Sequence, residues 1–299
     1  MSVNQEPWQW PEPVWRGHIN RVRAGRRLVA EVPEERWPGG AEAAVLISFD
    51  SDHETPFLRD GNVTPAAMGM GEYGARVAVP RILALLERHA VPASFFIPAV
   101  CALQRPDEVP GYVERGHEVG VHGWIHERNS LLPREAERDL LARAADVLEM
   151  QAGVRPVGIR TPSWDFSPHT LDIIRELGFH YDSSLMADDE PYELLAEGEQ
   201  TGIIEIPVEW IRDDAPFLMM DRFGGLRPTY TPRELLQVWK DEFDGALAEG
   251  GVFNLTLHPH IIGHRSRLFV LDELLSYISQ HRVWYATHAQ LASHVAPLI

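Results

Sequence analysis

The sequence is poor in cysteine and in basic residues, and each shortage excludes a class of protein or site. A single cysteine, Cys101, rules out an intramolecular disulfide and a zinc site built on a CxxC pair. Its apolar neighbours predict a packed core thiol rather than a nucleophile. The chain has 27 Lys and Arg against 44 Asp and Glu, a formal net charge of −17. Because nucleic acids and anionic membranes bind basic surfaces, we expect neither as a partner.

Long apolar runs are also missing. No stretch of the 299 residues approaches the roughly 18–20 apolar residues that cross a bilayer. The first residues, MSVNQEPWQWPEPVW, lack the basic segment followed by an apolar one that marks a secretory signal. The expected location is therefore the cytoplasm.

Residues 1–40 differ in composition from the rest of the chain. They hold four tryptophans and an Arg-rich stretch, RGHINRVRAGRR. Two interpretations stay open: an arm that wraps its own domain through the tryptophans, or an arm that docks on a second subunit. No linker or repeat interrupts residues 41–299. We therefore predict an N-terminal arm over 1–40 and one folded domain over 41–299, with a homo-oligomer permitted.

After residue 41, short apolar runs alternate with amphipathic patterns. The runs typical of strands are 43–49, 93–99, 117–123, 156–160, 202–210, 251–260 and 283–287. Helical periodicity or capping signals mark 76–90, 134–153, 167–179 and 232–250. This alternation predicts an α/β fold with a mainly parallel sheet, open or closed into a barrel. Seven or eight strands in one run favour a single barrel.

Titratable residues follow several of these strands directly. Reactive groups of parallel α/β folds gather at the C-terminal strand ends, so we expect these residues to meet on one face. They are Asp50 and Asp52 after the first strand, His122 and His126 after 117–123, Arg160 after 156–160, and His258 and His260 after 251–260.

The spacing of these residues suits a metal site. His122 and His126, four residues apart, point the same way if their segment turns helically, and a carboxylate would complete three ligands with an open position. Asp50 and Asp52 alternate along an extended strand and face one side. Unpaired, the two carboxylates would repel; a metal on one and a cation such as Arg160 on the other resolves this.

These motifs together resemble the polysaccharide deacetylase family with the NodB homology domain, over about residues 43–290. SFDSD, HGWIH, RTPSW and LTLH stand where the family has its first, second, third and fifth motifs. The resemblance implies a distorted (β/α) barrel of about seven parallel strands over 41–299. It also implies a role for each motif residue: Asp50 as general base, Arg160 as its brace, His258 as general acid, and Asp52, His122 and His126 as metal ligands.

Some features depart from the common pattern. Ser51 separates the two aspartates, Gly123 follows His122, and no DxxDW fourth motif is visible, which puts the usual tuning of the acid histidine in doubt. With HPHIIGHRSR (258–267), these features resemble a subgroup that holds intracellular peptidoglycan-deacetylase-like proteins and metal-independent allantoinases. The implied substrates are N-acetylated glycans or a small cyclic amide.

The resulting prediction is a metal-dependent hydrolase of a non-peptide C–N bond, most simply a deacetylase acting on an N-acetyl sugar, alone or in an oligosaccharide. Zinc is the expected divalent ion, with cobalt or nickel as alternatives. An allantoinase-like hydrolase of a cyclic amide, acting without metal, is the alternative function. Trp164, His260, Arg265 and Arg267 are candidate substrate-binding residues; core packing competes for the tryptophan, and surface ion pairs compete for both arginines.

Two other classes explain the sequence less well. The DxD of Asp50 and Asp52 also holds a metal on nucleotide sugars in glycosyltransferases, but no Gly-rich phosphate loop follows the first strand. A degenerate barrel used only for binding would be expected to lose Asp50 or His258, and both are present.

Overall fold

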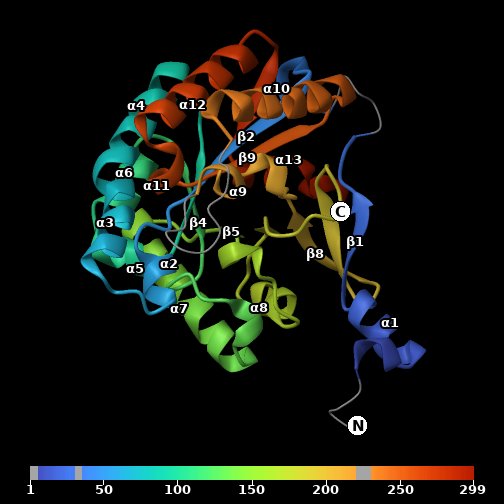
Figure 1. Cartoon of the computed structure of the whole chain (residues 1–299). Coiled ribbons are helices and arrows are strands. Elements are labelled where there is room, and N and C mark those ends of the chain that lie inside the picture. Colours follow the sequence, from blue (N-terminus) through green and yellow to red (C-terminus); the bar gives the residue numbers. More distant parts are fainter. Residues whose placement is uncertain (1–5, 31–35, 220–229) are drawn as a thin grey trace.

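The computed structural model describes residues 6–30, 36–219 and 230–299. Its strands form one sheet in which eight of the described strands run parallel: seven follow the order β8-β6-β5-β4-β3-β2-β9, and β10 also pairs with β2 (Figure 1). The strands are β1 (Val22–Arg27), β2 (Ala43–Asp50), β3 (Ser94–Ile97), β4 (Glu118–Val121), β5 (Gly158–Ile159), β6 (Tyr181–Asp182), β7 (Tyr192–Ala196), β8 (Glu199–Glu205), β9 (Val252–Leu257) and β10 (Val283–Ala286). The predicted α/β class with a mainly parallel sheet is confirmed.

The central strand is β2, which has partner strands along both edges and whose eight residues are all buried. It pairs with β9 along one edge, and with β10 and then β3 along the other. Two contacts join β9 to the chain that follows β8: a parallel bridge between Asp213 and Thr256, and a hydrogen bond from Asn254 Nδ2 to the Pro207 carbonyl at 2.9 Å. These contacts close the seven strands into a distorted barrel, as predicted.

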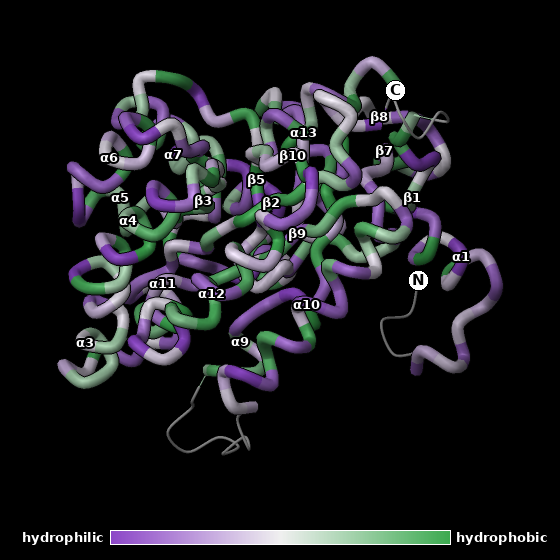
Figure 2. The backbone as a smooth tube through the Cα atoms, turned by 90° about the horizontal axis from the view of Figure 1, so that it is seen from above, coloured by the Kyte–Doolittle hydropathy of each residue, from purple (hydrophilic) through white to green (hydrophobic). Residues whose placement is uncertain are grey.

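Helices cover much of the outside of the barrel, while β7, β8 and β1 lie along one side (Figure 2). The helices are α1 (Glu12–Asn20), α2 (Thr55–Arg59), α3 (Pro65–Tyr73), α4 (Val79–His89), α5 (Ala99–Gln104), α6 (Glu108–Glu114), α7 (Arg134–Ala152), α8 (Thr170–Glu176), α9 (Ala215–Leu218), α10 (Pro232–Glu249), α11 (Pro259–Ile262), α12 (Arg265–Ile278) and α13 (His288–Val295), with a π-helical turn at Gly74–Ala78. The longer ones bury one apolar stripe, as in α7, where Leu141, Ala144, Ala145 and Leu148 face inward.

The helix ends follow the signals in the sequence. Helix α10 begins with a capping box between Thr231 and Glu234 and ends at Gly250, which adopts the left-handed conformation (φ 64°). Helix α8 is shorter than the predicted 167–179. Its N-cap is His169 rather than the predicted Ser167, although Ser167 Oγ accepts the backbone N–H groups of His169 and Thr170 just before the helix.

The predicted arm belongs partly to the sheet. Strand β1 pairs with β7 antiparallel, an element that the apolar patterns did not predict. Trp37 is buried and donates its indole N–H to the Gly250 carbonyl at 2.8 Å, whereas Trp8 is 80% exposed. Helix α1 lies beside β1 at the edge of the molecule (Figure 1). Residues 1–5 and 31–35 of the arm lie outside the described residues.

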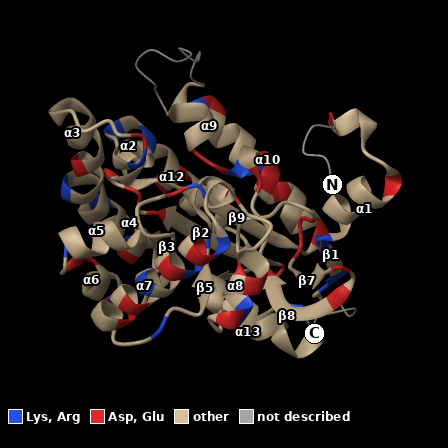
Figure 3. Ribbon diagram, turned by 90° about the horizontal axis from the view of Figure 1, so that it is seen from below, with Lys and Arg blue, Asp and Glu red and all other residues tan. Residues whose placement is uncertain are grey.

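The surface matches the acidic composition. Asp and Glu side chains are distributed over many helices and loops, interspersed with arginines (Figure 3). None of the helices in the described ranges combines the length and apolar character required of a membrane span.

Candidate active site

The C-terminal ends of β2, β4, β5 and β9 meet at one mouth of the barrel. A cavity of about 230 Å³ opens there. Seven residues predicted from the sequence line this cavity: Asp50, Asp52, His122, His126, Trp164, His258 and His260. Arg59, Trp210 and Asp213 also line it, although the sequence did not point to them. Four strands distant in sequence therefore place their terminal side chains around one small space.

Asp52, His122 and His126 form a compact cluster. Asp52 Oδ1 lies 3.3 Å from His122 Nε2, and Oδ2 lies 3.4 Å from His126 Nε2. All three side chains are buried, and one ligand atom from each lies within 4.8 Å of the others. Burial opposes the charged form of Asp52, yet His126 and His122 hold the pKa of its carboxyl well below its usual value.

The two histidines converge through a loop rather than through a helical turn. Gly123 and His126 both have positive φ (71° and 63°), which reverses the chain after β4. The Glu127 carboxylate closes the loop by accepting the backbone N–H groups of Trp124 and Ile125. The prediction that both rings face one point agrees with the structure, but its assumed helical geometry was wrong.

The cluster suits a divalent metal. His122 Nδ1 lies 2.8 Å from the Arg160 carbonyl, which only accepts, so Nδ1 carries the proton and Nε2 is available as a ligand. Asp52 Oδ1 is buried and makes no hydrogen bond. Two neutral imidazoles and one carboxylate are a donor set that zinc accepts with a position left open.

Arg59 modifies this fit at His126. Its Nη1 lies 3.0 Å from His126 Nδ1. Because a guanidinium only donates, Nδ1 is the acceptor here and the ring proton sits on Nε2, toward Asp52. Metal binding at Nε2 requires that proton to leave and Nδ1 to become the protonated nitrogen. A hydrogen bond from Arg59 and a metal ion at Nε2 therefore require different tautomers of His126, so the two compete.

Asp50 lies beside the cluster, next to His122. Arg160 Nη1 donates to its Oδ1 at 2.8 Å, and Arg160 is fully buried. The other oxygen, Oδ2, lies 3.8 Å from His122 Nε2 and 4.0 Å from His258 Nε2. Its carboxylate thus faces the cavity with one oxygen bonded to a cation and the other directed toward the two histidines.

His258 has carboxylate partners that the sequence motifs did not reveal. Asp214 Oδ1 lies 2.7 Å from His258 Nδ1, and Asp213 Oδ1 lies 3.5 Å away. Burial disfavours the charged ring, but Asp213 and Asp214 raise the pKa of His258 well above its usual value. An Asp-Asp pair thus neighbours His258, and its signal in the sequence is RDD after the 202–210 strand.

The cavity has an apolar wall. Trp164 lies against Trp210, with ring centroids 4.0 Å apart. Ser163 and Trp164 both adopt positive φ (55° and 54°), so the chain after β5 is strained to present this indole. His260 also lines the cavity, and burial lowers its pKa to about 3, so the ring is neutral at physiological pH.

The two predicted arginine contacts lie elsewhere. Arg265 and Arg267 belong to the first turn of α12, and neither lines the cavity. Arg267 Nη1 donates to the Ile261 carbonyl at 2.9 Å, so it supports the segment that follows His258. The structure does not bring these two side chains together with the other predicted residues.

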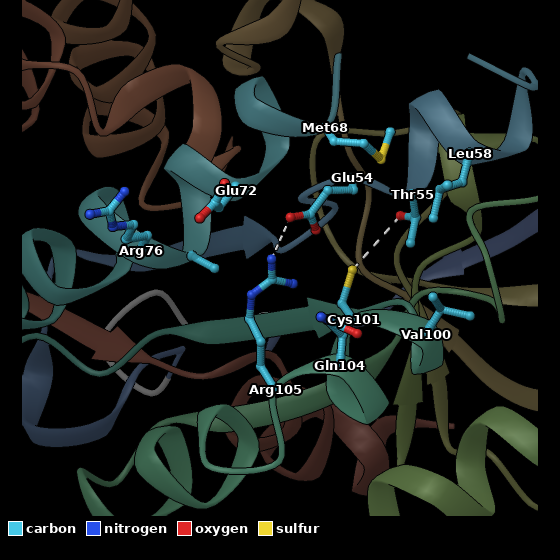
Figure 4. A pocket seen from close by; sticks show the side chains of 11 residues that line it. Glu54, Thr55, Leu58, Met68, Glu72, Arg76, Val100, Cys101, Gln104 and Arg105 are labelled. Carbon is cyan, nitrogen blue, oxygen red and sulfur yellow. Dashed lines mark hydrogen bonds and ion pairs between the residues drawn. The ribbon is translucent and has the colours of Figure 1, made fainter. Parts of the chain in front are cut away.

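A second cavity, of about 620 Å³, lies on the other side of α2 (Figure 4). Glu54 pairs there with Arg105, and the Cys101 thiol donates to the Asp52 carbonyl at 3.1 Å. Cys101 is buried, and burial raises its pKa well above the usual value, as expected for a packed core thiol. On this side the backbone of Asp52 is anchored, while its carboxylate points toward His122 and His126.

Comparisons with known proteins relate this chain to polysaccharide deacetylases. Residues 68–181 match the polysaccharide deacetylase family model. A candidate polysaccharide deacetylase from Mycobacterium smegmatis is 34% identical, and its crystal structure gives a TM-score of 0.83 over 93% of this chain and 96% of that one. The peptidoglycan deacetylase of Helicobacter pylori is 28% identical over 84% of this chain and 95% of its own length. The crystal structure of Puue allantoinase is 25% identical, with a TM-score of 0.76 over 91% of this chain and 97% of that one.

Proposed function

This chain belongs to the polysaccharide deacetylase family of hydrolases acting on non-peptide C–N bonds, and we propose that it removes acetyl groups from N-acetylated sugars with the help of a divalent metal, most simply zinc. Asp52, His122 and His126 would hold the ion. When bound, it would lower the pKa of a water molecule and polarise the amide carbonyl.

The remaining steps belong to the chain's own side chains. Asp50 takes the proton of the attacking water, and Arg160 keeps that carboxylate oriented and paired with a cation. His258 donates a proton to the leaving nitrogen, since Asp214 and Asp213 keep its imidazolium form stable. Trp164 and Trp210 shield the cavity from water on one side.

One observation supports the proposal: the proposed base and the proposed acid both lie within 4.0 Å of the cluster of Asp52, His122 and His126. Asp50 Oδ2 and Asp52 Oδ2 lie 4.0 Å and 3.8 Å from His258 Nε2. The three functions needed for amide hydrolysis, namely water activation, proton removal and proton delivery, are therefore available around one reacting carbon.

A cyclic-amide hydrolase acting without metal is the second candidate. The 230 Å³ cavity with tryptophan walls favours a compact substrate, and Arg59 holds His126 in the tautomer that a metal-free site would have. In that case Asp50 and His258 would keep the same roles on a ring amide, and the similarity to the allantoinase structure would extend to function.

Metal content and substrate together test the proposal. Purified protein should contain about one equivalent of zinc by elemental mass spectrometry, and Asp52→Ala and His126→Ala should lose it. His294→Ala, a hydrogen-bonded histidine of α13 away from the cavity, is the matched control. Acetate release from N-acetylglucosamine oligomers should follow metal content. A protein that stays metal-free after reconstitution and opens allantoin instead would establish the second candidate.

A further inference from the structure

The guanidinium of Arg160 has every donor used. Nε donates to the Ser183 carbonyl, Nη1 to Ser48 Oγ and Asp50 Oδ1, and Nη2 to Ser183 Oγ and to His288 Nε2 at 3.2 Å. The five N–H groups of a guanidinium thus meet five acceptors. Since the side chain is fully buried, water cannot replace any of these acceptors.

The proton positions on His288 follow from its neighbours. A guanidinium cannot accept, so Nε2 must carry the lone pair and Nδ1 the proton. Nδ1 lies 3.0 Å from Ser94 Oγ, which in turn donates to Glu118 Oε2 at 2.7 Å. Burial and the charge of Arg160 keep the pKa of His288 well below its usual value, so the ring stays neutral.

This gives a directed chain of hydrogen bonds that runs from Arg160 through His288 and Ser94 to the half-buried carboxylate of Glu118. Its last three members come from three separate elements: Glu118 opens β4, Ser94 opens β3, and His288 opens α13. The Ala289 backbone N–H also donates to Glu118 Oε2 at 2.9 Å, and the His288 backbone N–H donates to Ser94 Oγ at 2.9 Å. The beginning of α13 is therefore fixed against the beginnings of two barrel strands.

We propose that His288 is a positioning residue for the catalytic base: by accepting from Arg160 Nη2, it sets the plane of the guanidinium and thereby the placement of Asp50. The proposal rests on the function assigned to Asp50 above. His288 does not line the cavity, so it acts only through Arg160. The guanidinium carbon of Arg160 lies 4.2 Å from the centroid of the Phe96 ring. Contact with the flat ring alone would let the guanidinium rotate within its own plane. The hydrogen-bond acceptors around it prevent this rotation.

Substituting His288 by Leu and by Gln separates positioning from packing. Leu removes the acceptor, whereas Gln places its amide oxygen where Nε2 lies and restores it. We expect His288→Leu to lower kcat about 10–100-fold, in the range found when such supporting hydrogen bonds are removed, with KM and metal content unchanged. His288→Gln should recover most of kcat. His294→Leu, on the same helix and also hydrogen-bonded, should leave kcat unchanged.

A second readout needs no substrate. The guanidinium N–H protons of Arg160 should exchange slowly with solvent in ¹⁵N NMR spectra of the wild type and of His288→Gln. They should exchange faster in His288→Leu and, to a smaller extent, in Ser94→Ala, which leaves Nδ1 without its acceptor. If His288→Leu fails to fold, His288→Gln and Ser94→Ala still decide the question.

Equal kcat in the Leu and Gln variants, or a change in KM alone, would overturn the positioning role. Unaltered exchange at Arg160 in Ser94→Ala and His288→Leu would overturn it as well. If the wild type releases no acetate from any N-acetylated sugar, the proposed function fails, but the exchange measurement still tests the hydrogen-bond chain.

Discussion

The contact between Asp214 and His258 allows the most direct test of the acid. Asp214 uses both carboxylate oxygens on one residue: Oδ1 accepts from His258 Nδ1 at 2.7 Å, and Oδ2 accepts from the His258 backbone N–H at 3.1 Å. Asp214→Asn preserves the shape but turns one oxygen into an NH₂ group. One of the two donors of His258 must then face another donor, whichever way the amide is oriented.

The size of the effect follows from this geometry. A hydrogen bond to a charged group contributes about 1.5–3 kcal/mol, and here it stabilises only the imidazolium form. The pKa of His258 should therefore fall by roughly one to two pH units. Asp213 and Asp214 raise the pKa of His258 well above its usual value, so the ring stays protonated to a higher pH than a free histidine and activity is lost only above that pKa. In the variant, the alkaline limb of kcat should move to lower pH by the same one to two units, and at pH values above the wild-type limb turnover should fall about 10–100-fold.

Asp213→Asn is the matched control. Asp213 Oδ1 lies 3.5 Å from His258 Nδ1 and accepts from the Ala215 N–H at 2.8 Å, so it acts on His258 through charge rather than through a hydrogen bond. We expect a smaller shift than in Asp214→Asn, measured by NMR titration of the His258 ring and by the pH dependence of acetate release. Equal shifts in both variants, or an unmoved alkaline limb, would refute the reasoning.

Two further predictions concern the surroundings of the site. Arg59→Met should bind zinc more tightly in calorimetry, because His126 Nδ1 is then free to carry the proton; the surface variant Arg155→Met should bind as the wild type does, and weaker binding by Arg59→Met would contradict the competition. Burial raises the pKa of Asp182 to about 6 and that of its neighbour Glu205 well above the usual value. Because both folded-state pKa values exceed the unfolded ones, stability is present at low pH and is lost as the pH rises through them. Glu205→Gln should reduce the drop in unfolding free energy between pH 5 and pH 8 by about 1–3 kcal/mol in urea titrations, whereas an unchanged drop would exclude this pair as its origin.

Much of the site could be predicted because its residues follow buried strands. Asp50 and Asp52 extend the apolar run of β2 with a period of two, and His122, Arg160 and His258 each come directly after a strand. In a parallel sheet the ends of such strands must meet, so no tertiary information was needed to group these side chains. The backbone path that brings His126 next to His122 could not be predicted. The chain there turns through residues with positive φ, which a spacing pattern does not encode.

The partners of these residues could not be predicted in the same way. Asp214 is 44 positions from His258, and a parallel bridge next to it, between Asp213 and Thr256, places it there as the barrel closes. His288 lies 128 positions from Arg160 on a helix that carries no motif. The antiparallel pairing of β1 with β7 was equally hidden, because an Arg-rich strand shows no apolar alternation.

The sequence by itself therefore determined the fold class, the family and the titratable groups at the strand ends, because alternation along strands and the chemistry of the motifs are local properties. The tertiary structure alone decided which acceptors satisfy the buried donors of Arg160 and His258. A buried donor must be paired, but any segment that barrel closure brings within hydrogen-bonding distance can supply the partner. That choice fixes the tautomers and protonation states on which the proposed chemistry depends.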